Sequence, residues 1–457
     1  MKIKKFLFTL VALGFILNPI SAQQTGPPET DNRFYDIIEA SSPERIEADI
    51  RRLVGFGTRN TFSDTLSETR GIGAARKWIK SEFEKISQEC GNCLEVFYQQ
   101  DYVEKTEGSR VPHSAWIVNV VAVLRGTEYP NSYAMMSGDI DSRSSNTMNY
   151  EIDAPGANDN ASGMAGTIEA ARILSKYKFK HSIAFVGLSG EEQGLFGGAG
   201  LAKYAQENNW EIVGLLNNDM IGNIEGVDGV VSNRDFRIFS EPTPANESER
   251  LRRSRRTVGG EVDGNSRQLA RFIYTQVQTY MPEMNPMMIY RLDRFGRGGH
   301  HRPFNDLGFA GVRIMEAHEN YVRQHQDVRV ENGIAYGDVI EGVNFEYAAK
   351  LTAVNAISLA GLAWGPKAPE DVRIGGAVQP STTLQWKESN DPNIIGYKLY
   401  WRLTTSPTWD SSRFVSGVNE FTLEGIVIDN YYFGVAAVSK NGSESPVVFP
   451  YQQMRRR

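Results

Sequence analysis

The stretch Ser182-Ile-Ala-Phe-Val-Gly-Leu188, with Glu191 and Glu192 just beyond it, decides the fold of this chain. Its nearly continuous apolar character is typical of a β-strand that is buried on both faces. Similar runs lie at 115–124, 133–137, 212–216 and 311–315, and helical patterns lie at 71–88 and 161–177. Apolar strands that alternate with helices predict an α/β fold, in which helices cover both faces of a mostly parallel sheet.

Acidic residues follow several of these predicted strands or precede a predicted helix. They are Asp139, Asp141, Asp159, Glu191, Glu192 and Asp219. Ligands of open α/β sheets bind outside the carboxyl ends of the strands, so separate strands would bring these carboxylates to one rim. Crowded carboxylates raise each other's pKa, and divalent metal ions relieve that repulsion. Each acid taken alone is better explained as a solvated loop residue, but the set as a whole indicates a metal site.

An ordered set of motifs resembles the M28 family of zinc aminopeptidases, over residues 45 to 362. The motifs are Asn158-Asp-Asn-Ala-Ser-Gly163, Gly190-Glu-Glu-Gln-Gly194, Asn217-Asn-Asp-Met-Ile-Gly222, Gly298-Gly-His-His-Arg-Pro-Phe304 and Gln324-His-Gln-Asp327. Each motif is short, but their order is specific. The resemblance implies a zinc-exopeptidase-like fold and a metallopeptidase domain, which we place at 30–365.

The resemblance also implies two divalent metal ions, with zinc expected and another divalent metal an alternative in the second site. Asp159 would bridge the ions. Glu192 and His325 would complete one site, and Asp139 and Asp219 the other. Such ions activate water and polarise a scissile carbonyl.

Further roles follow from the same resemblance. Glu191 would be the general base that takes a proton from the attacking water. Asp141 would orient the ligand at position 139. His301 would contact the substrate or the oxyanion, or else be structural. Independently of the resemblance, Arg297 is a candidate for substrate contact, because it leads directly into the Gly298-Gly299 segment.

The sequence departs from the family pattern at two positions that bear on the second metal site. Asp139 stands where the family usually has a histidine, and His300 stands where an acid is frequent. A carboxylate oxygen also binds zinc, but it is a harder ligand than imidazole. We therefore expect the metal at Asp139 to be the weaker of the two.

The N-terminal residues 1–22 have the features of a secretory signal peptide. Lys2, Lys4 and Lys5 precede a short apolar run, and Ala22 ends the segment. We therefore expect export to the periplasm or the extracellular space. Nothing later in the chain reaches the ~18 consecutive apolar residues that indicate a membrane span. In an exported chain, Cys90 and Cys93 are expected to form a small surface disulfide.

Residues 367–450 have a different pattern from the rest of the chain. Short alternating runs at 383–386, 396–401 and 431–437 are separated by turn-forming residues, which predicts a small β-sandwich. The segment resembles a fibronectin type III domain, with an opening Ala-Pro and Trp386 in an early strand. Its expected contacts are a protein, a polysaccharide or the catalytic domain.

The function expected from these observations is a secreted metal-dependent exopeptidase. It would be an aminopeptidase that removes N-terminal residues from a peptide substrate through a water activated by two metal ions. The alternatives are a single-zinc acyltransferase similar to glutaminyl cyclases, and a non-catalytic binding ectodomain. A nucleic-acid partner is not expected, because 49 Lys plus Arg against 55 Asp plus Glu give a formal net charge of −6.

Overall fold

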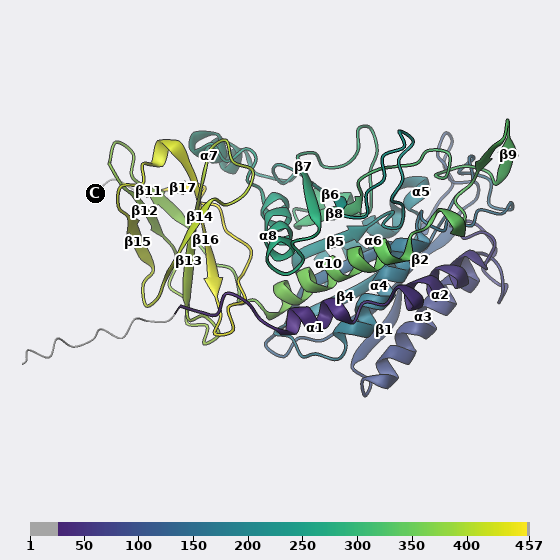
Figure 1. Ribbon diagram of the computed structural model, residues 1–457, viewed down its shortest axis with the longest axis horizontal. Helices are drawn as coiled ribbons and strands as arrows, with labels where there is room; N and C mark the ends of the chain where they lie inside the picture. Colours follow the sequence, from purple (N-terminus) through teal and green to yellow (C-terminus); the bar gives the residue numbers. More distant parts are fainter. Residues whose placement is uncertain (1–25, 455–457) are drawn as a thin grey trace, which may run out of the picture.

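The computed structural model describes residues 26–454, so the predicted signal peptide at 1–22 lies outside the described residues. Figure 1 shows a large helix-covered sheet with two small sheets from the C-terminal residues, in yellow-green, beside it. The helices are α1 (Arg33–Glu39), α2 (Pro43–Val54), α3 (Gly71–Glu89), α4 (Ala161–Leu174), α5 (Glu191–Gly194), α6 (Phe196–Glu207), α7 (Glu249–Val258), α8 (Asn265–Tyr280), α9 (His301–Asp306) and α10 (Phe345–Trp364). Within residues 26–454, no helix is both long and apolar enough to cross a bilayer.

The large sheet has eight strands in the order β1-β2-β4-β3-β5-β8-β6-β7. Their bounds are β1 (Leu94–Val103), β2 (Ala115–Leu124), β3 (Tyr129–Asp139), β4 (His181–Leu188), β5 (Glu211–Asn218), β6 (Asp235–Ser240), β7 (Asn285–Ile289) and β8 (Gly311–Glu316). The central strands β4, β3, β5 and β8 are parallel, which confirms the predicted mostly parallel sheet. β2 and β6 run antiparallel to this centre. The antiparallel edges were not predicted.

Helices cover both faces of this sheet, as predicted, because successive side chains of a strand point to opposite faces. On β3, Ala134 and Met136 belong to the core cluster that contains α4 and α10 residues. Tyr133 and Met135 belong to a second cluster, with Leu201 of α6 and other residues of the opposite layer. The two clusters make the strands buried on both faces, which explains their nearly continuous apolar sequences.

The carboxyl ends of β3, β4 and β5 lie level with one another. Asp139 pairs with Leu188 of β4, and Gly138 pairs with Asn218 of β5. The residues that follow these strands therefore emerge at one edge of the sheet. A Cβ at Gly138 would lie 2.5 Å from the backbone of Gly163, so only glycine lets the start of α4 approach this edge.

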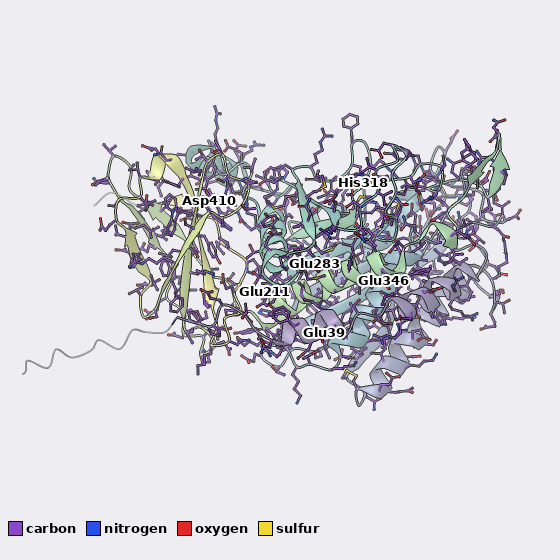
Figure 2. All side chains as sticks on the ribbon, in the orientation of Figure 1. Glu39, Glu211, Glu283, His318, Glu346 and Asp410 are labelled. Atoms are coloured by element: carbon purple, nitrogen blue, oxygen red, sulfur yellow. A yellow bond between two sulfur atoms is a disulfide. The ribbon has the colours of Figure 1, made fainter. Side chains whose placement is uncertain are left out.

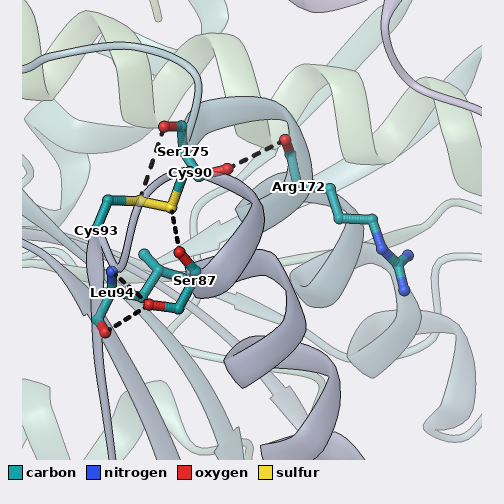
Figure 3. The surroundings of a disulfide bond; sticks show 6 residues. All are labelled: Ser87, Cys90, Cys93, Leu94, Arg172 and Ser175. Atoms are coloured by element: carbon teal, nitrogen blue, oxygen red, sulfur yellow. Dashed lines mark hydrogen bonds between the residues drawn. A yellow bond between two sulfur atoms is a disulfide. The ribbon is translucent and has the colours of Figure 1, made fainter.

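The turn from α3 to β1 contains the cysteine pair. Cys90 and Cys93 are joined by a disulfide with an S–S distance of 2.04 Å (Figure 3). Ser87 adds two hydrogen bonds across the same turn: its hydroxyl accepts from the Leu94 amide (3.1 Å) and donates to the Leu94 carbonyl (3.0 Å). The turn is thereby fixed both covalently and by hydrogen bonds.

The C-terminal residues form two small sheets that face each other. Their order is β15-β12-β11-β17 in one and β14-β13-β16 in the other. The strands are β11 (Arg373–Gly375), β12 (Thr382–Gln385), β13 (Gly396–Leu403), β14 (Ser411–Val415), β15 (Glu420–Leu423), β16 (Tyr431–Val438) and β17 (Gln452–Gln453), and a separate hairpin is made by β9 (Arg329–Glu331) and β10 (Ile334–Tyr336). Trp386 and Phe433 lie in a core of their own between the two sheets. The fibronectin type III-like classification and the domain bounds stay predictions.

A buried charge cluster joins these sheets to the larger part of the chain. Asp263, just before α8, accepts hydrogen bonds from Arg271 of α8 (2.7 Å) and from Arg402 of β13 (2.8 Å). The side chains of Asp263, Arg271 and Arg402 are 0–2% exposed. The guanidinium of Arg271 also donates to the Pro407 carbonyl (2.8 Å).

Candidate metal centre

Three side chains from separate segments meet at the carboxyl edge of the sheet. Asp159 lies in the loop before α4, Glu192 lies in α5, and His325 lies in the loop between β8 and β9. His325 Nε2 is 2.8 Å from Asp159 Oδ2 and 3.2 Å from Glu192 Oε1. In the described part of the chain, these residues form the one group of at least three potential ligands whose atoms all lie within 4.8 Å of one another.

The carboxylates of this group are far less exposed to solvent than many other acidic side chains of the chain. Glu39, Glu211, Glu283, Glu346 and Asp410 are exposed to solvent and scattered over the surface (Figure 2). Glu192, in contrast, has a side chain only 6% exposed, and that of Asp159 is 12% exposed. Carboxylates buried in this way need a positive partner.

The loop that carries Asp159 is held by its backbone. The carboxylate of Asp338 accepts hydrogen bonds from the backbone amides of Asn158 (2.8 Å) and Asp159 (2.6 Å). The side chain of Asn160 caps α4 by accepting from the Gly163 amide (3.0 Å). The backbone at Asp159 is thus fixed by the carboxylate of Asp338 and by the capped N-terminus of α4.

Glu191 and Glu192 are positioned by Asp141. The amides of Glu191 and Glu192 donate to the two carboxylate oxygens of Asp141, at 3.3 and 3.2 Å. Thr61 donates its hydroxyl to the same carboxylate (3.0 Å). Asp141 was predicted to orient residue 139, but its hydrogen bonds instead fix the start of α5. The Ile140 amide donates to the Leu188 carbonyl (2.7 Å), so the chain after β3 stays beside the end of β4, close to the start of α5.

The electrostatics of the group fit a cation. Burial by itself lowers the pKa of His325, but the carboxylates of Glu192 and Asp159 raise it to about 10. Burial by itself raises the pKa of Asp159, but the hydrogen bond and charge of His325 hold it well below its usual value. The two carboxylates therefore bind a positive charge, here the proton of His325. Zinc takes the place of such a proton when it binds histidine, and two carboxylates with one imidazole are ligands that it accepts.

Glu191 borders this group. Its pKa lies well above its usual value because of burial and the negative charges of Glu192, Asp219 and Asp139. A bound cation would offset those charges and favour the ionised form. A carboxylate beside the group, and outside it, is the arrangement that a general base requires.

The other two predicted ligands, Asp139 and Asp219, lie outside this group. The carboxylate of Asp139 contacts His300 Nδ1 (2.6 Å) and accepts from the side-chain amide of Asn160 (2.7 Å). Asp219 Oδ2 lies 2.5 Å from Arg313 Nη2. Arg313 thus occupies one oxygen of Asp219, whereas the other, Oδ1, is buried without a hydrogen-bond partner among the described residues. Burial and neighbouring carboxylates raise the pKa of Asp139 to about 8 and that of Asp219 to about 7. The second ion stays a prediction.

His301 and Arg297 take different positions. His301 is fully buried, and its Nε2 lies 2.7 Å from the carbonyl oxygen of Leu292, so it braces the preceding loop. Burial lowers the pKa of His301 to about 4. Arg297 is 32% exposed and lies 3.5 Å from Glu319; its charge also helps to lower the pKa of Asp159, so it lies on the rim of the site.

Comparison with known proteins places this geometry in a family. The model described as peptidase family M28 matches residues 119–329. A probable zinc metalloprotease of Leptosphaeria maculans is 40% identical over 425 residues, covering 93% of this chain and 98% of that protein. The chain belongs to peptidase family M28. A probable zinc metalloprotease of Pyrenophora tritici-repentis is 37% identical to this M28 chain, over 92% of the chain and 98% of the relative.

Solved structures share the fold of this M28 peptidase chain. The LapA aminopeptidase of Legionella pneumophila has a TM-score of 0.52 and 17% identity, covering 80% of this chain and 81% of that one. A glutaminyl cyclase of Macrostomum lignano has a TM-score of 0.51 and 14% identity, covering 74% of this chain and 94% of that one. At these identities the likeness is one of fold.

Sequence reasoning missed two residues of the M28 site. Arg313 pairs with Asp219, and a charged residue inside the apolar run at 311–315 was a signal that could have revealed it. Asp338 clamps the Asp159 loop from a distant segment, and no sequence pattern singles it out.

Proposed function

We propose that this chain is an exported, zinc-dependent aminopeptidase that removes N-terminal residues from peptides. The observation that carries the proposal is the convergence of Asp159, Glu192 and His325, with Glu191 beside them, at the carboxyl edge of the sheet. The names of the two relatives, which are probable zinc metalloproteases, support the choice of zinc.

The residues have distinct roles in the proposed reaction. Asp159, Glu192 and His325 would hold the zinc ion, which supplies polarisation of the scissile carbonyl and a more acidic water. Glu191 accepts the proton of the attacking water and returns it to the leaving nitrogen. Asp141 keeps Glu191 in place, because its carboxylate accepts a hydrogen bond from the backbone amide of Glu191 (3.3 Å). Arg297, on the rim, contacts the peptide.

One observation favours a second candidate, a glutaminyl-cyclase-like acyltransferase. Only a single ligand group is assembled among residues 26–454, and that alternative needs a single zinc. The retained ligand group argues against a third candidate, a non-catalytic binding ectodomain. Contact between the C-terminal sheets and the catalytic part, through Asp263 and Arg402, supports a role for those sheets in packing.

The test is a comparison of matched peptides. We expect release of the first residue from a peptide with a free N-terminus and none from its N-acetylated form. A chelator should abolish the release, and added zinc should restore it. Equal cleavage of both forms would contradict aminopeptidase specificity. Loss of ammonia from an N-terminal glutaminyl peptide, without release of residues, would establish the cyclase.

A further inference from the structure

Arg313 lies at the place predicted for a second metal ion. It projects from β8, and its side chain is 0% exposed. Its Nη2 atom is 2.5 Å from Asp219 Oδ2, and its Nη1 atom is 3.1 Å from Asp293 Oδ1. Nη1 also donates to the carbonyl of Gly298 (2.9 Å). The guanidinium is therefore held on both sides, and the side chain cannot rotate away without breaking these ion pairs and the hydrogen bond.

Arg313 is held in its charged form by its acidic neighbours. Burial by itself lowers the pKa of Arg313, but the carboxylates of Asp219 and Asp293 raise it above its ordinary value, so the side chain stays positive. Arg294 lies 3.9 Å from the same Asp219 oxygen. A divalent cation at Asp219 would meet two positive groups, and displacing Arg313 would remove the shortest ion-pair contact of the buried Asp293 carboxylate.

Asp139, the other predicted ligand of that ion, is also engaged. One of its oxygens lies 2.6 Å from Nδ1 of the fully buried His300. The other accepts from Asn160, whose side chain also caps α4. Asp139 thus joins the end of β3 to α4 and to His300.

We infer that Arg313 replaces the second metal ion, so that each chain binds one zinc ion and carries a fixed guanidinium beside it. The inference rests on the proposed zinc site at Asp159, Glu192 and His325. Arg313 is a positioning residue: it holds Asp219 on one side and Asp293 on the other. Unlike a metal ion, the positive charge of its guanidinium is not removed by a chelator.

The test is the zinc content of the purified full chain, measured by mass spectrometry after saturation with zinc and removal of the excess. We expect one equivalent in the wild type and still one in Asp219→Asn, because Asp219 pairs with Arg313 and not with zinc. Two equivalents in the wild type that fall to one in Asp219→Asn would overturn the inference. His325→Ala should lose the single equivalent; if it retains zinc, the proposed zinc site fails instead.

A second variant tests Arg313 itself. Arg313→Met leaves Asp219 and Asp293 with only the longer contacts to Arg294, at 3.9 and 3.5 Å, and we expect a second equivalent of zinc to bind there. The matched control is Arg267→Met, which removes an equally buried arginine that bonds Ser240 (2.7 Å); it should keep one equivalent. A folded Arg313→Met that still binds one equivalent would overturn the replacement. If this variant does not fold, the wild type and Asp219→Asn decide the question.

Discussion

Glu191 and Glu192 are adjacent in the chain, yet their carboxylates have different surroundings. Glu192 Oε1 lies 3.2 Å from His325, and its other oxygen lies 3.6 Å from Arg143. Glu191 belongs to no such group of ligand atoms within residues 26–454. Asp141 fixes the backbone of both residues. The two adjacent carboxylates therefore differ in their contacts: that of Glu192 belongs to the ligand group, and that of Glu191 does not.

We predict that Glu191→Gln lowers kcat by ~10²–10⁴-fold, because a general base contributes that much, while the zinc content is unchanged. Glu192→Gln is the matched comparison and should lose zinc. Steady-state kinetics on a small aminoacyl substrate, together with metal analysis, checks both. If Glu191→Gln lost the zinc and Glu192→Gln kept it, the two roles would be reversed.

The sequence allowed part of this site to be predicted. Motif order identified Asp159, Glu192 and His325, which the structure brings together. The partners of Asp219 could not be predicted, because they depend on which strands are neighbours. β8 lies beside β5, and Arg313 pairs in register with Asn217, close to Asp219. An arginine from a distant segment can satisfy a carboxylate as well as a metal ion does, and sequence spacing does not distinguish the two.

At the scale of elements, the apolar runs predicted the buried strands well. The strand at 115–124 has the predicted bounds, and the helix at Gly71–Glu89 differs by one residue. Strand direction was harder to predict. β2 is antiparallel to β4 but is buried on both faces, so its sequence has the same apolar character as a parallel strand. β1, β6 and β7 were missed: β1 and β6 mix polar with apolar residues, and β7 is only five residues long.

Glu241, between β6 and α7, gives a pH-dependent contribution to stability. It is 5% exposed, and burial raises the pKa of its carboxyl to about 8, against a weak hydrogen bond from Ser266 (3.4 Å). The folded state therefore keeps the proton to a higher pH than the unfolded chain. This contribution is fully present below the unfolded pKa of 4.5 and is lost as the pH rises through about 8.

We predict that Glu241→Gln becomes progressively more stable than the wild type as the pH rises from 5 to 9. Glutamine has no charge to bury, and a pKa shift corresponds to ~1.4 kcal/mol per unit, so the gain is on the order of a few kcal/mol. Urea unfolding at a series of pH values measures it. Glu283→Gln, at an exposed position, is the control. A constant difference between variant and wild type across this range would contradict the prediction.

At the scale of the whole molecule, the C-terminal sheets are attached by more than surface contact. Asp263 accepts from Arg402 at 2.8 Å, and the Tyr451 hydroxyl donates to the Asp263 carbonyl at 3.1 Å. All the proposed zinc ligands precede residue 366, so the chemistry does not require these sheets. We expect the stability of the catalytic part to depend on them, because Arg402 completes a buried ion pair with Asp263.

Breaking that ion pair should lower stability without affecting the chemistry. We predict that Arg402→Met reduces the free energy of unfolding by about 3 kcal/mol, at the lower end for a buried ion pair because Asp263 keeps Arg271. The control is Arg413→Met, at an exposed arginine of β14.

Truncation near Pro366 should destabilise the chain further, while hydrolysis of a small substrate survives below the unfolding temperature. Urea unfolding and kcat/KM check both variants and the truncation. Loss of activity with a native circular dichroism spectrum would show that the C-terminal sheets contribute to the active site.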